Sequence, residues 1–170
     1  GTCLSDLGNQ VICVDIDEEK INKLKQGKVP IYEPGLNGLI DRNAKEGRLS
    51  FTTDLKSAVK DAEVIYIAVG TPPKPNGDAD LSYIGNVARE IGNAIDSYKV
   101  IVEKSTVPVE TGEKVAKTIR LNNPHNTEFD VVSNPEFLRE GSAVDDFLKP
   151  DRIVIGTKSK KAADIMKKLY

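Results

Sequence analysis

Two kinds of hydrophobic pattern alternate along the 170-residue chain. Short runs rich in β-branched residues, without internal polar alternation, are typical of strands buried on both faces of a parallel sheet. Six such runs cover residues 11–15, 49–53, 64–69, 100–104, 129–133 and 152–155. They predict an α/β fold in which the strands lie mostly parallel and are separated by helices.

The longer segments between these runs have apolar residues at helical spacing. In 81–96 the apolar residues fall on one face of a helix, at positions 81, 84, 87, 88, 91 and 95. Asp80 is placed to cap this helix, and Pro108 suits the first turn of the next one, over 109–120. We also expect helices over 17–26 and 54–61, a helix ending near Gly8, and one starting at 162.

Composition and charge narrow the class of protein. A chain with 39% hydrophobic and 29% charged residues is ordinary for one globular domain, and no linker divides it. A net charge of −2 gives no electrostatic reason to expect nucleic acid or an anionic membrane as a partner. The longest strongly apolar run, 64–69, is too short to span a bilayer.

The cysteines and the histidine do not suggest metal or triad chemistry. Cys3 and Cys13 lack metal-ligand spacing, and Cys13 lies within a predicted strand, where we expect a buried, inert thiol. His125 is the single histidine and lies in the polar stretch NNPHNTE, where we expect it to be exposed. We therefore expect no metal site and no histidine-based catalytic triad.

Residues capable of chemistry gather where the predicted strands end. Four strands are followed by glycine, hydroxyl or carboxylate groups, namely Asp15, Gly70 with Thr71, Ser105 with Thr106, and Glu136. In open α/β sheets, ligands bind beyond the carboxyl ends of the strands. These residues therefore indicate one crevice, although glycine, proline and polar residues also end strands that bind nothing.

Asp15 has the position of a nucleotide-binding acid. An acid at the end of the second strand of a dinucleotide-binding unit accepts hydrogen bonds from the adenosine ribose, and its charge disfavours a 2′-phosphate, so NAD is preferred over NADP. The associated glycine loop lies about 20 residues earlier, which places it before residue 1. An acid at this position also serves methyltransferases that use S-adenosylmethionine.

The remaining strand-end features have a structural alternative. Gly70 allows a ligand to approach the backbone, and the stretch KPNGDAD is long enough to cross a crevice but is equally typical of a surface loop. Glu136 and Glu140 share a face if a helical turn starts at Phe137, and paired acids can divide acid and base roles. They are also the acids expected at an ordinary helix N-terminus.

Six stretches occur in a characteristic order: VDIDEEKI, PIYEPGL, VGTPPKPNGDADL, EKSTVPVETG, NPEFLREGSAVDDF and PDRIVIG. Together they resemble the UDP-glucose/GDP-mannose dehydrogenase family over essentially the whole chain. The continuation SAVDDFLKPDRIVIG favours the UDP-glucose branch over the GDP-mannose branch. The resemblance implies a Rossmann-like, doubly wound, mostly parallel sheet that lacks its first strand and glycine-rich loop.

The resemblance also implies the reaction. The family oxidises the sugar C6 alcohol to a carboxylate with two NAD in sequence, through a thioester on a cysteine. On this basis residues 1–170 are a partial N-terminal NAD-binding domain, and the central helix, the C-terminal UDP-binding domain and the cysteine lie elsewhere. We expect the chain alone to be inactive and to bind NAD poorly. We expect the full-length protein to be cytoplasmic and a homodimer or higher homo-oligomer.

Roles for individual residues follow from the same resemblance. Thr106 and Glu136 match catalytic positions, for the ordering of water or relay of a proton and for thioester hydrolysis. The cofactor-binding positions are Asp15, Lys20, Val69, Gly70, Thr71, Ser105, Thr106 and Glu140. The substrate-binding positions are Glu136, Phe137, Leu138, Arg139 and Glu140.

Two other functions stay open at this point. A GDP-mannose dehydrogenase performs the same chemistry on another sugar nucleotide. A non-catalytic nucleotide-binding module is compatible with the absence of a matching nucleophile, since neither Cys3 nor Cys13 corresponds to the family's cysteine. A methyltransferase gives no role to the KSTVP and NPEFLREG stretches.

Overall fold

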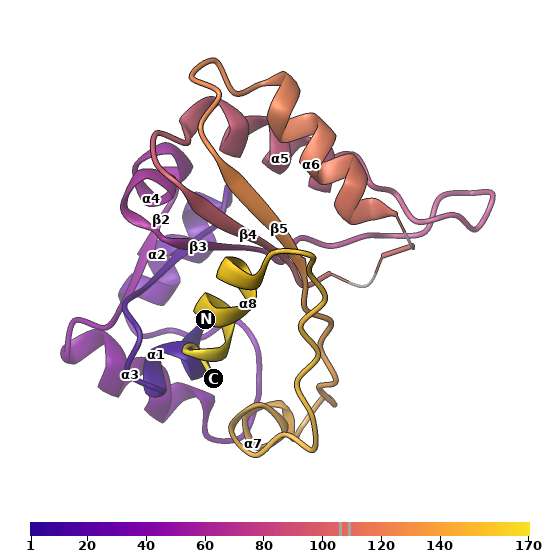
Figure 1. Cartoon of the computed structure of the whole chain (residues 1–170). Helices are drawn as coiled ribbons and strands as arrows, with labels where there is room; N and C mark the ends of the chain where they lie inside the picture. The colour runs from indigo at the N-terminus through magenta and orange to yellow at the C-terminus, as the bar shows by residue number, and fades with distance from the viewer. Residues whose placement is uncertain (106, 109) are drawn as a thin grey trace. The chain divides into compact units, whose positions relative to one another are not determined.

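The structure is a computed structural model that describes residues 1–105, 107–108 and 110–170. Its five strands and eight helices are shown in Figure 1. The chain packs as two compact units. Unit 1 contains Gly1–Ala58, Phe137–Ile153 and Lys167–Tyr170, and unit 2 contains Val59–Glu136 and Val154–Met166.

Unit 1 is built around two parallel strands. Strand β1 (Val11–Val14) pairs with β2 (Leu49–Thr52) so that Val11 lies opposite Leu49 and Val14 opposite Thr52. The helices that lie entirely within unit 1 are α1 (Thr2–Asp6), α2 (Glu18–Lys25), α3 (Leu36–Lys45) and α7 (Ala143–Leu148). Gly8 adopts a φ of 98° just after α1, which confirms the expected helix end there.

Helix α2 follows directly from local sequence. Asp17 is its N-cap, and its carboxylate accepts a hydrogen bond from the Lys20 backbone amide at 3.0 Å. Acids occupy the first turn and lysines the last turn, an arrangement that complements the helix dipole. Ile21 is buried and anchors the apolar face of the helix in unit 1.

A buried amide, Asn43, joins three elements of unit 1. Its Nδ2 donates to Asp6 Oδ1 at 3.1 Å and to the Leu39 carbonyl at 2.8 Å. Its Oδ1 accepts from Arg48 Nε at 3.0 Å and Nη2 at 2.8 Å. Because the fully buried side chain has partners for both its donor and its acceptor atoms, it fixes α1 and α3 against the start of β2 without a desolvation penalty.

Unit 2 contains three parallel strands in the order β3–β4–β5. Strand β4 (Lys99–Glu103) is central and buried at every residue, between β3 (Val64–Ile67) and β5 (Phe129–Ser133). Val64 lies opposite Val100, and Val100 lies opposite Asp130. The carboxyl ends of all three strands therefore meet at one edge of this sheet.

Helices α5 (Ser82–Ala94) and α6 (Thr111–Leu121) connect these strands and lie side by side along β4 and β5 (Figure 1). The predicted apolar face of α5 is confirmed, because Ile84, Ala88 and Ile91 are buried. Helix α8 (Lys160–Lys167) buries Ala162 and Met166, while α4 (Leu55–Asp61) precedes β3.

The strands of the described residues form two separate hydrogen-bonded sheets, β1–β2 and β3–β4–β5. The sixth predicted strand, 152–155, is wrong. Among the described residues, the bridge that this part of the chain makes is at Gly156, which exchanges two hydrogen bonds with Ser133 in an antiparallel arrangement. A strand pairs with its neighbour at several consecutive residues. A single paired position is therefore an isolated bridge and not a strand.

Two predicted helix starts also need correction. Asp80 does accept a hydrogen bond from the Ser82 amide at 3.0 Å, but Leu81 is the N-cap of α5. Pro108 lies ahead of α6, which starts at Thr111 after Glu110 adopts a left-handed φ of 77°. The Pro108 carbonyl accepts from the Thr111 hydroxyl at 2.8 Å, so this residue contributes to the turn that precedes the helix.

Within the described residues, every helix is too short or too polar to cross a membrane.

Candidate functional site

An open pocket of about 330 Å³ lies at the carboxyl edge of the three-stranded sheet in unit 2. It is lined by Ala68, Val69, Gly70, Thr71, Lys104, Ser105 and Glu136. Each lining residue follows β3, β4 or β5, so the parallel arrangement of the strands brings the three loops together. Five of the predicted site residues, Val69, Gly70, Thr71, Ser105 and Glu136, therefore line one pocket.

Ser105 links two of these loops. Its hydroxyl donates to the Val69 carbonyl at 2.8 Å and so ties the end of β4 to the end of β3. A Cβ added at Gly70 meets no atom within 4 Å. The glycine therefore does not relieve a packing contact, and it leaves open space above the backbone where a ligand can approach.

Lys104 and Glu136 give the pocket both signs of charge. Burial lowers the pKa of Lys104, and the nearby Glu136 carboxylate opposes that shift. The Lys104 ammonium group donates to the Asn134 carbonyl at 3.5 Å. We did not predict Lys104 as a site residue, although its place in KSTVP, next to Ser105 at a strand end, is the signal that identifies it.

Glu103 lies beneath this edge, at the end of β4. Its side chain is buried, burial raises its pKa, and Oε1 has no hydrogen-bond partner among the described residues. A Cβ at Gly112 in the first turn of α6 comes within 3.6 Å of its Oε2. A buried carboxyl group at the end of β4 is unusual, because charged residues are rarely fully buried without a partner.

The stretch after Gly70 forms a small hairpin. Pro73 and Ala79 make an antiparallel bridge, and the Lys74 amide donates to the Asp78 carbonyl at 2.7 Å. Gly77 takes a φ of 87° in the turn, a conformation that favours glycine. The predicted turn-rich loop is therefore an ordered extension that leaves the pocket edge and returns to α5.

Unit 1 contains the predicted cofactor contacts Asp15 and Lys20. Asp15 follows β1, and its Oδ2 accepts from the Lys20 ammonium group, while Oδ1 accepts from the Asp17 amide at 3.1 Å. The Lys20 hydrogen bond is the main cause of a lowered Asp15 pKa. The sequence predicted both residues as cofactor contacts, and the structure shows that they also pair with each other.

These residues fit an adenosine ribose. A carboxylate has roughly four acceptor positions, and the two contacts of Asp15 leave acceptor capacity for ribose hydroxyl groups. Asp15 remains 30% exposed, so a ligand can reach it. The pocket in unit 2 supplies open space at Gly70 and hydroxyl and charged groups around it.

Of the predicted sugar-nucleotide segment, Glu136–Glu140, residues 137–140 lie in unit 1, in the loop before α7. The expectation that Glu136 and Glu140 share a helical face is wrong, because residues 134–139 are not helical and the two residues belong to different units. Gly141 takes a left-handed φ of 84°, which is incompatible with a continuous helix here. Phe137, Leu138 and Glu140 are exposed.

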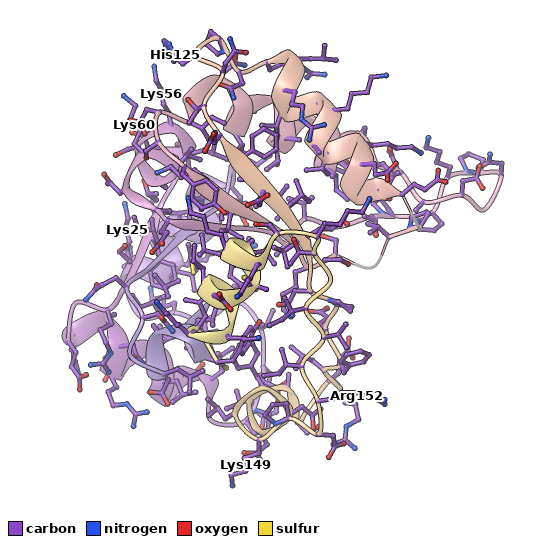
Figure 2. The ribbon with its side chains drawn as sticks, viewed as in Figure 1. Lys25, Lys56, Lys60, His125, Lys149 and Arg152 are labelled. Atoms are coloured by element: carbon purple, nitrogen blue, oxygen red, sulfur yellow. The ribbon has the colours of Figure 1, made fainter. Side chains whose placement is uncertain are left out.

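Arg139 is engaged within its own loop. Its backbone amide donates to Asp146 Oδ2 at 2.9 Å, and its Nη2 donates to Asp146 Oδ1 at 2.6 Å. These bonds hold the pKa of Asp146 well below its usual range. Arg152 stacks over the Phe137 ring at 5.4 Å and can be located in Figure 2. The Arg139 guanidinium thus shapes the segment in addition to any contact with substrate.

The remaining predictions concern three single residues. Thr106 lies outside the described residues, so its predicted catalytic and cofactor roles stay predictions. His125 is exposed in the turn before β5, as predicted, and points away from the protein (Figure 2). Cys13 is half-buried and unpaired, and burial raises the pKa of its thiol, in keeping with an inert residue.

Parallel strands with crossover helices, a carboxyl-edge pocket and an acid after β1 define an α/β nucleotide-binding domain of the Rossmann-like dehydrogenase class. The comparison with protein families is specific. Residues 1–170 match the NAD binding domain of the UDP-glucose/GDP-mannose dehydrogenase family, and the chain belongs to that family.

Individual relatives agree with this assignment. The chain is 52% identical over 170 residues to UDP-glucose 6-dehydrogenase TuaD of Bacillus subtilis, and the match covers all of this chain and 37% of that protein. The structure of a UDP-glucose dehydrogenase from Pyrobaculum islandicum matches with a TM-score of 0.96 and 42% identity, over 99% of this chain and 40% of that one.

A GDP-mannose dehydrogenase of Pseudomonas aeruginosa, solved as a ternary complex, matches with a TM-score of 0.95 and 44% identity, again over 99% of this chain and 40% of that one. The chain thus spans about two fifths of the length of the relatives that it matches.

Proposed function

We propose that the full-length protein containing these residues oxidises UDP-glucose to UDP-glucuronate with two molecules of NAD. The observation that carries this proposal is the pocket in which Gly70, Ser105 and Glu136 meet, in a chain of the dehydrogenase family. The identity to TuaD, 52%, is higher than the 43% identity to GDP-mannose 6-dehydrogenase of Pseudomonas aeruginosa, and this difference supports UDP-glucose as the substrate.

NAD, when bound, would supply the hydride acceptor for the oxidation, and the residues of this chain would hold the reactants in place. Asp15 and Lys20 bind the adenosine ribose. Val69, Gly70, Thr71 and Ser105 line the pocket of unit 2 and are further proposed cofactor contacts. Thr106 and Glu140 are proposed cofactor contacts on the basis of the family resemblance. The ordered hydrogen bond from Ser105 to the Val69 carbonyl keeps this part of the pocket rigid, which favours a single bound orientation.

Glu136 is the proposed general base. Its carboxylate lines the pocket, where it can accept a proton from a water molecule that attacks the acyl carbon of a thioester. The thioester forms on a cysteine outside residues 1–170, and nucleophilic catalysis of this kind divides a difficult oxidation into two easier steps. Thr106 orders the water or relays its proton.

The sugar nucleotide is proposed to bind along residues 136–140. The loop leaves Phe137, Leu138 and Glu140 exposed, so that they are available for contact with a ligand. Arg139 stabilises the loop through Asp146. We further propose that this chain is part of an N-terminal domain, that a UDP-binding domain follows it, and that the full-length protein is a cytoplasmic homodimer or higher homo-oligomer.

GDP-mannose is the second candidate substrate. Its support is the solved GDP-mannose dehydrogenase, which matches this chain nearly as well in fold as the UDP-glucose dehydrogenase does, with TM-scores of 0.95 and 0.96. Both substrates would undergo the same oxidation at C6, so the cofactor-binding residues of this chain do not distinguish them.

Steady-state kinetics of the full-length protein test the proposal. UDP-glucose and GDP-mannose are each supplied with NAD, and reduced cofactor is followed by absorbance while the uronate product is identified by mass spectrometry. We expect two NADH per UDP-glucuronate and a higher kcat/KM for UDP-glucose. A higher kcat/KM for GDP-mannose would reverse the substrate assignment, and NAD binding without turnover of either would favour a non-catalytic nucleotide-binding protein.

A further inference from the structure

Carboxylates hold three alternate backbone amides in the loop that leads into α7. The Arg139 amide donates to Asp146 at 2.9 Å, the Gly141 amide to Glu33 Oε2 at 2.9 Å, and the Ala143 amide to Glu33 Oε1 at 2.9 Å. Asp146 is close in sequence and on α7 itself. Glu33 comes from more than a hundred residues earlier and belongs to the PIYEPGL stretch, for which the proposed function gives no role.

Local geometry presents Glu33 firmly. The Leu36 amide donates to the Glu33 carbonyl at 3.1 Å, and Gly35 takes a φ of 80° at the third position of this turn. Proline followed by a glycine with positive φ is typical of a type II turn. The turn leads directly into α3, which begins at Leu36. The backbone of Glu33 is therefore fixed just before the N-terminus of this helix.

The loop before α7 needs an acceptor for the first backbone amide of that helix. Helix α7 begins at Ala143, and its N-cap, Ser142, makes no capping bond through its side chain. Its hydroxyl contacts Asp146 instead, at 3.2 Å. The first amide of α7 has no partner within its own helix, and Glu33 supplies the acceptor from another part of unit 1. Hydrogen bonds to a carboxylate are stronger than those to a neutral acceptor.

We propose that Glu33 is a positioning residue for the sugar-nucleotide segment. Glu140 lies between Arg139, whose amide is bound by Asp146, and Gly141, whose amide is bound by Glu33. The two carboxylates therefore fix the backbone on both sides of Glu140 and set the direction in which its exposed side chain leaves the loop. This inference rests on the proposed function for the identity of the ligand, but not for the contact itself.

Amide hydrogen exchange of the full-length protein, measured at the level of single residues, tests the contact. In the unsubstituted protein we expect protection at Gly141 and Ala143. In Glu33→Gln, which keeps the shape but loses the charge and one acceptor oxygen, we expect exchange at these two amides to accelerate at least about tenfold. The Arg139 amide serves as an internal control and should change little.

Glu19→Gln is a matched control, because Glu19 is an exposed acid of unit 1 that pairs only with Lys23 within α2 among the described contacts. It should leave exchange at Gly141 and Ala143 unchanged. Free exchange of these amides in the unsubstituted protein, or unaltered exchange in Glu33→Gln, would overturn the inference. The measurement on the unsubstituted protein decides the matter even if the variant does not fold.

Kinetics of the full-length protein test the positioning role. For Glu33→Gln we expect KM for UDP-glucose to rise about tenfold, while KM for NAD stays within about twofold of the original value. General loss of folded enzyme would lower kcat and leave both KM values unchanged. That result, or an equal rise in both KM values, would contradict the inference. Failure of the unsubstituted protein to oxidise UDP-glucose would instead count against the proposed function, and amide exchange would still decide the contact.

Discussion

Asp15 and Lys20 form an exposed ion pair at the end of β1, five residues apart in sequence. The ammonium group stabilises the ionised carboxylate, and this lowers the pKa of Asp15. The pair therefore keeps a negative charge at the proposed ribose site while a positive charge remains next to it. Removal of the negative partner alone should change which cofactor is tolerated there.

Asp15→Asn in the full-length protein should raise KM for NAD about tenfold. It should also narrow the preference for NAD over NADP, because Lys20 is then free to attract a 2′-phosphate. Steady-state kinetics with both cofactors measure the effect. Asp41→Asn, which removes another exposed Asp–Lys pair of unit 1, is the control and should leave both KM values unchanged. An unchanged NAD to NADP ratio in Asp15→Asn would rule out this role.

Glu103 is expected to make the stability of the folded chain depend on pH. Its pKa is raised in the folded chain by burial, so the folded state binds its proton more tightly than the unfolded state does. The contribution of this group to stability is therefore fully present below the unfolded pKa of about 4.3 and is lost as pH rises toward the raised folded value. At neutral pH the unfolded state is ionised at this position, so burial of the carboxyl group, whose Oε1 has no hydrogen-bond partner among the described residues, lowers the stability of unit 2.

Glu103→Gln should remove this loss. Urea unfolding followed by circular dichroism should give similar stabilities for the two proteins near pH 4 and a higher stability for the variant at pH 7. The expected gain is about 1–3 kcal/mol, because the neutral amide has no charge for burial to oppose. Glu113→Gln, an exposed acid in the first turn of α6, is the control. A pH dependence that is the same in Glu103→Gln and the unsubstituted chain would show that Glu103 does not titrate in this range.

Among the elements, close packing of α5 and α6 depends on one glycine. A Cβ at Gly92 would lie 2.8 Å from the Ile119 carbonyl oxygen and 3.2 Å from its Cα, both of which are backbone atoms of α6. A backbone contact cannot be relieved by a change of rotamer. The helices must therefore move apart if this position gains a side chain.

Gly92→Ala should lower the free energy of unfolding by about 1–3 kcal/mol, because overpacking costs more than the gain in helix propensity. Gly85→Ala is a matched control in the same helix, where an added Cβ meets no atom within 4 Å. There we expect a gain of roughly 0.5–1 kcal/mol. Thermal unfolding measures both variants, and equal effects at the two positions would show that the α5–α6 contact is looser than the structure has it.

The elements themselves were largely predictable. Five strands and the helices α2, α4, α5, α6 and α8 lie within a few residues of their predicted positions, because their apolar patterns are regular. Helices α3 and α7 were not predicted. The predicted strand at 152–155 failed because an apolar run does not reveal whether a neighbouring strand is available to pair with it. The predicted helical turn after Glu136 failed because Glu33 and Asp146 bind the loop amides, and these partners are not visible in the local pattern.

At the scale of the whole molecule, cofactor binding depends on a glycine motif that the 170-residue sequence does not contain. The motif, G-x-G-x-x-G, forms a loop. In this class of domain, that loop and the helix after it bind the cofactor phosphates through backbone amides and the helix dipole. Asp15, Lys20 and the pocket residues provide contacts for other parts of the cofactor only.

We therefore expect the 170-residue chain by itself to bind NAD with a dissociation constant well above the micromolar range. Isothermal titration calorimetry with NAD measures this directly, and the full-length protein under the same conditions is the comparison. Micromolar binding by the chain alone would show that the acid and the pocket provide most of the affinity, and that the phosphate contacts contribute little.

The sequence by itself determined the class of fold, the order of the elements, and the family. It also determined the strand-end residues that make up the candidate site, because the apolar pattern and the loop motifs are local features of the chain. The tertiary structure decided which groups pair. It brought Lys104 beside Glu136, joined Ser105 to Val69, and placed Glu33 against the amides of the loop before α7. These contacts join residues far apart in the sequence, and burial and charge at each contact depend on neighbours that only the folded chain supplies.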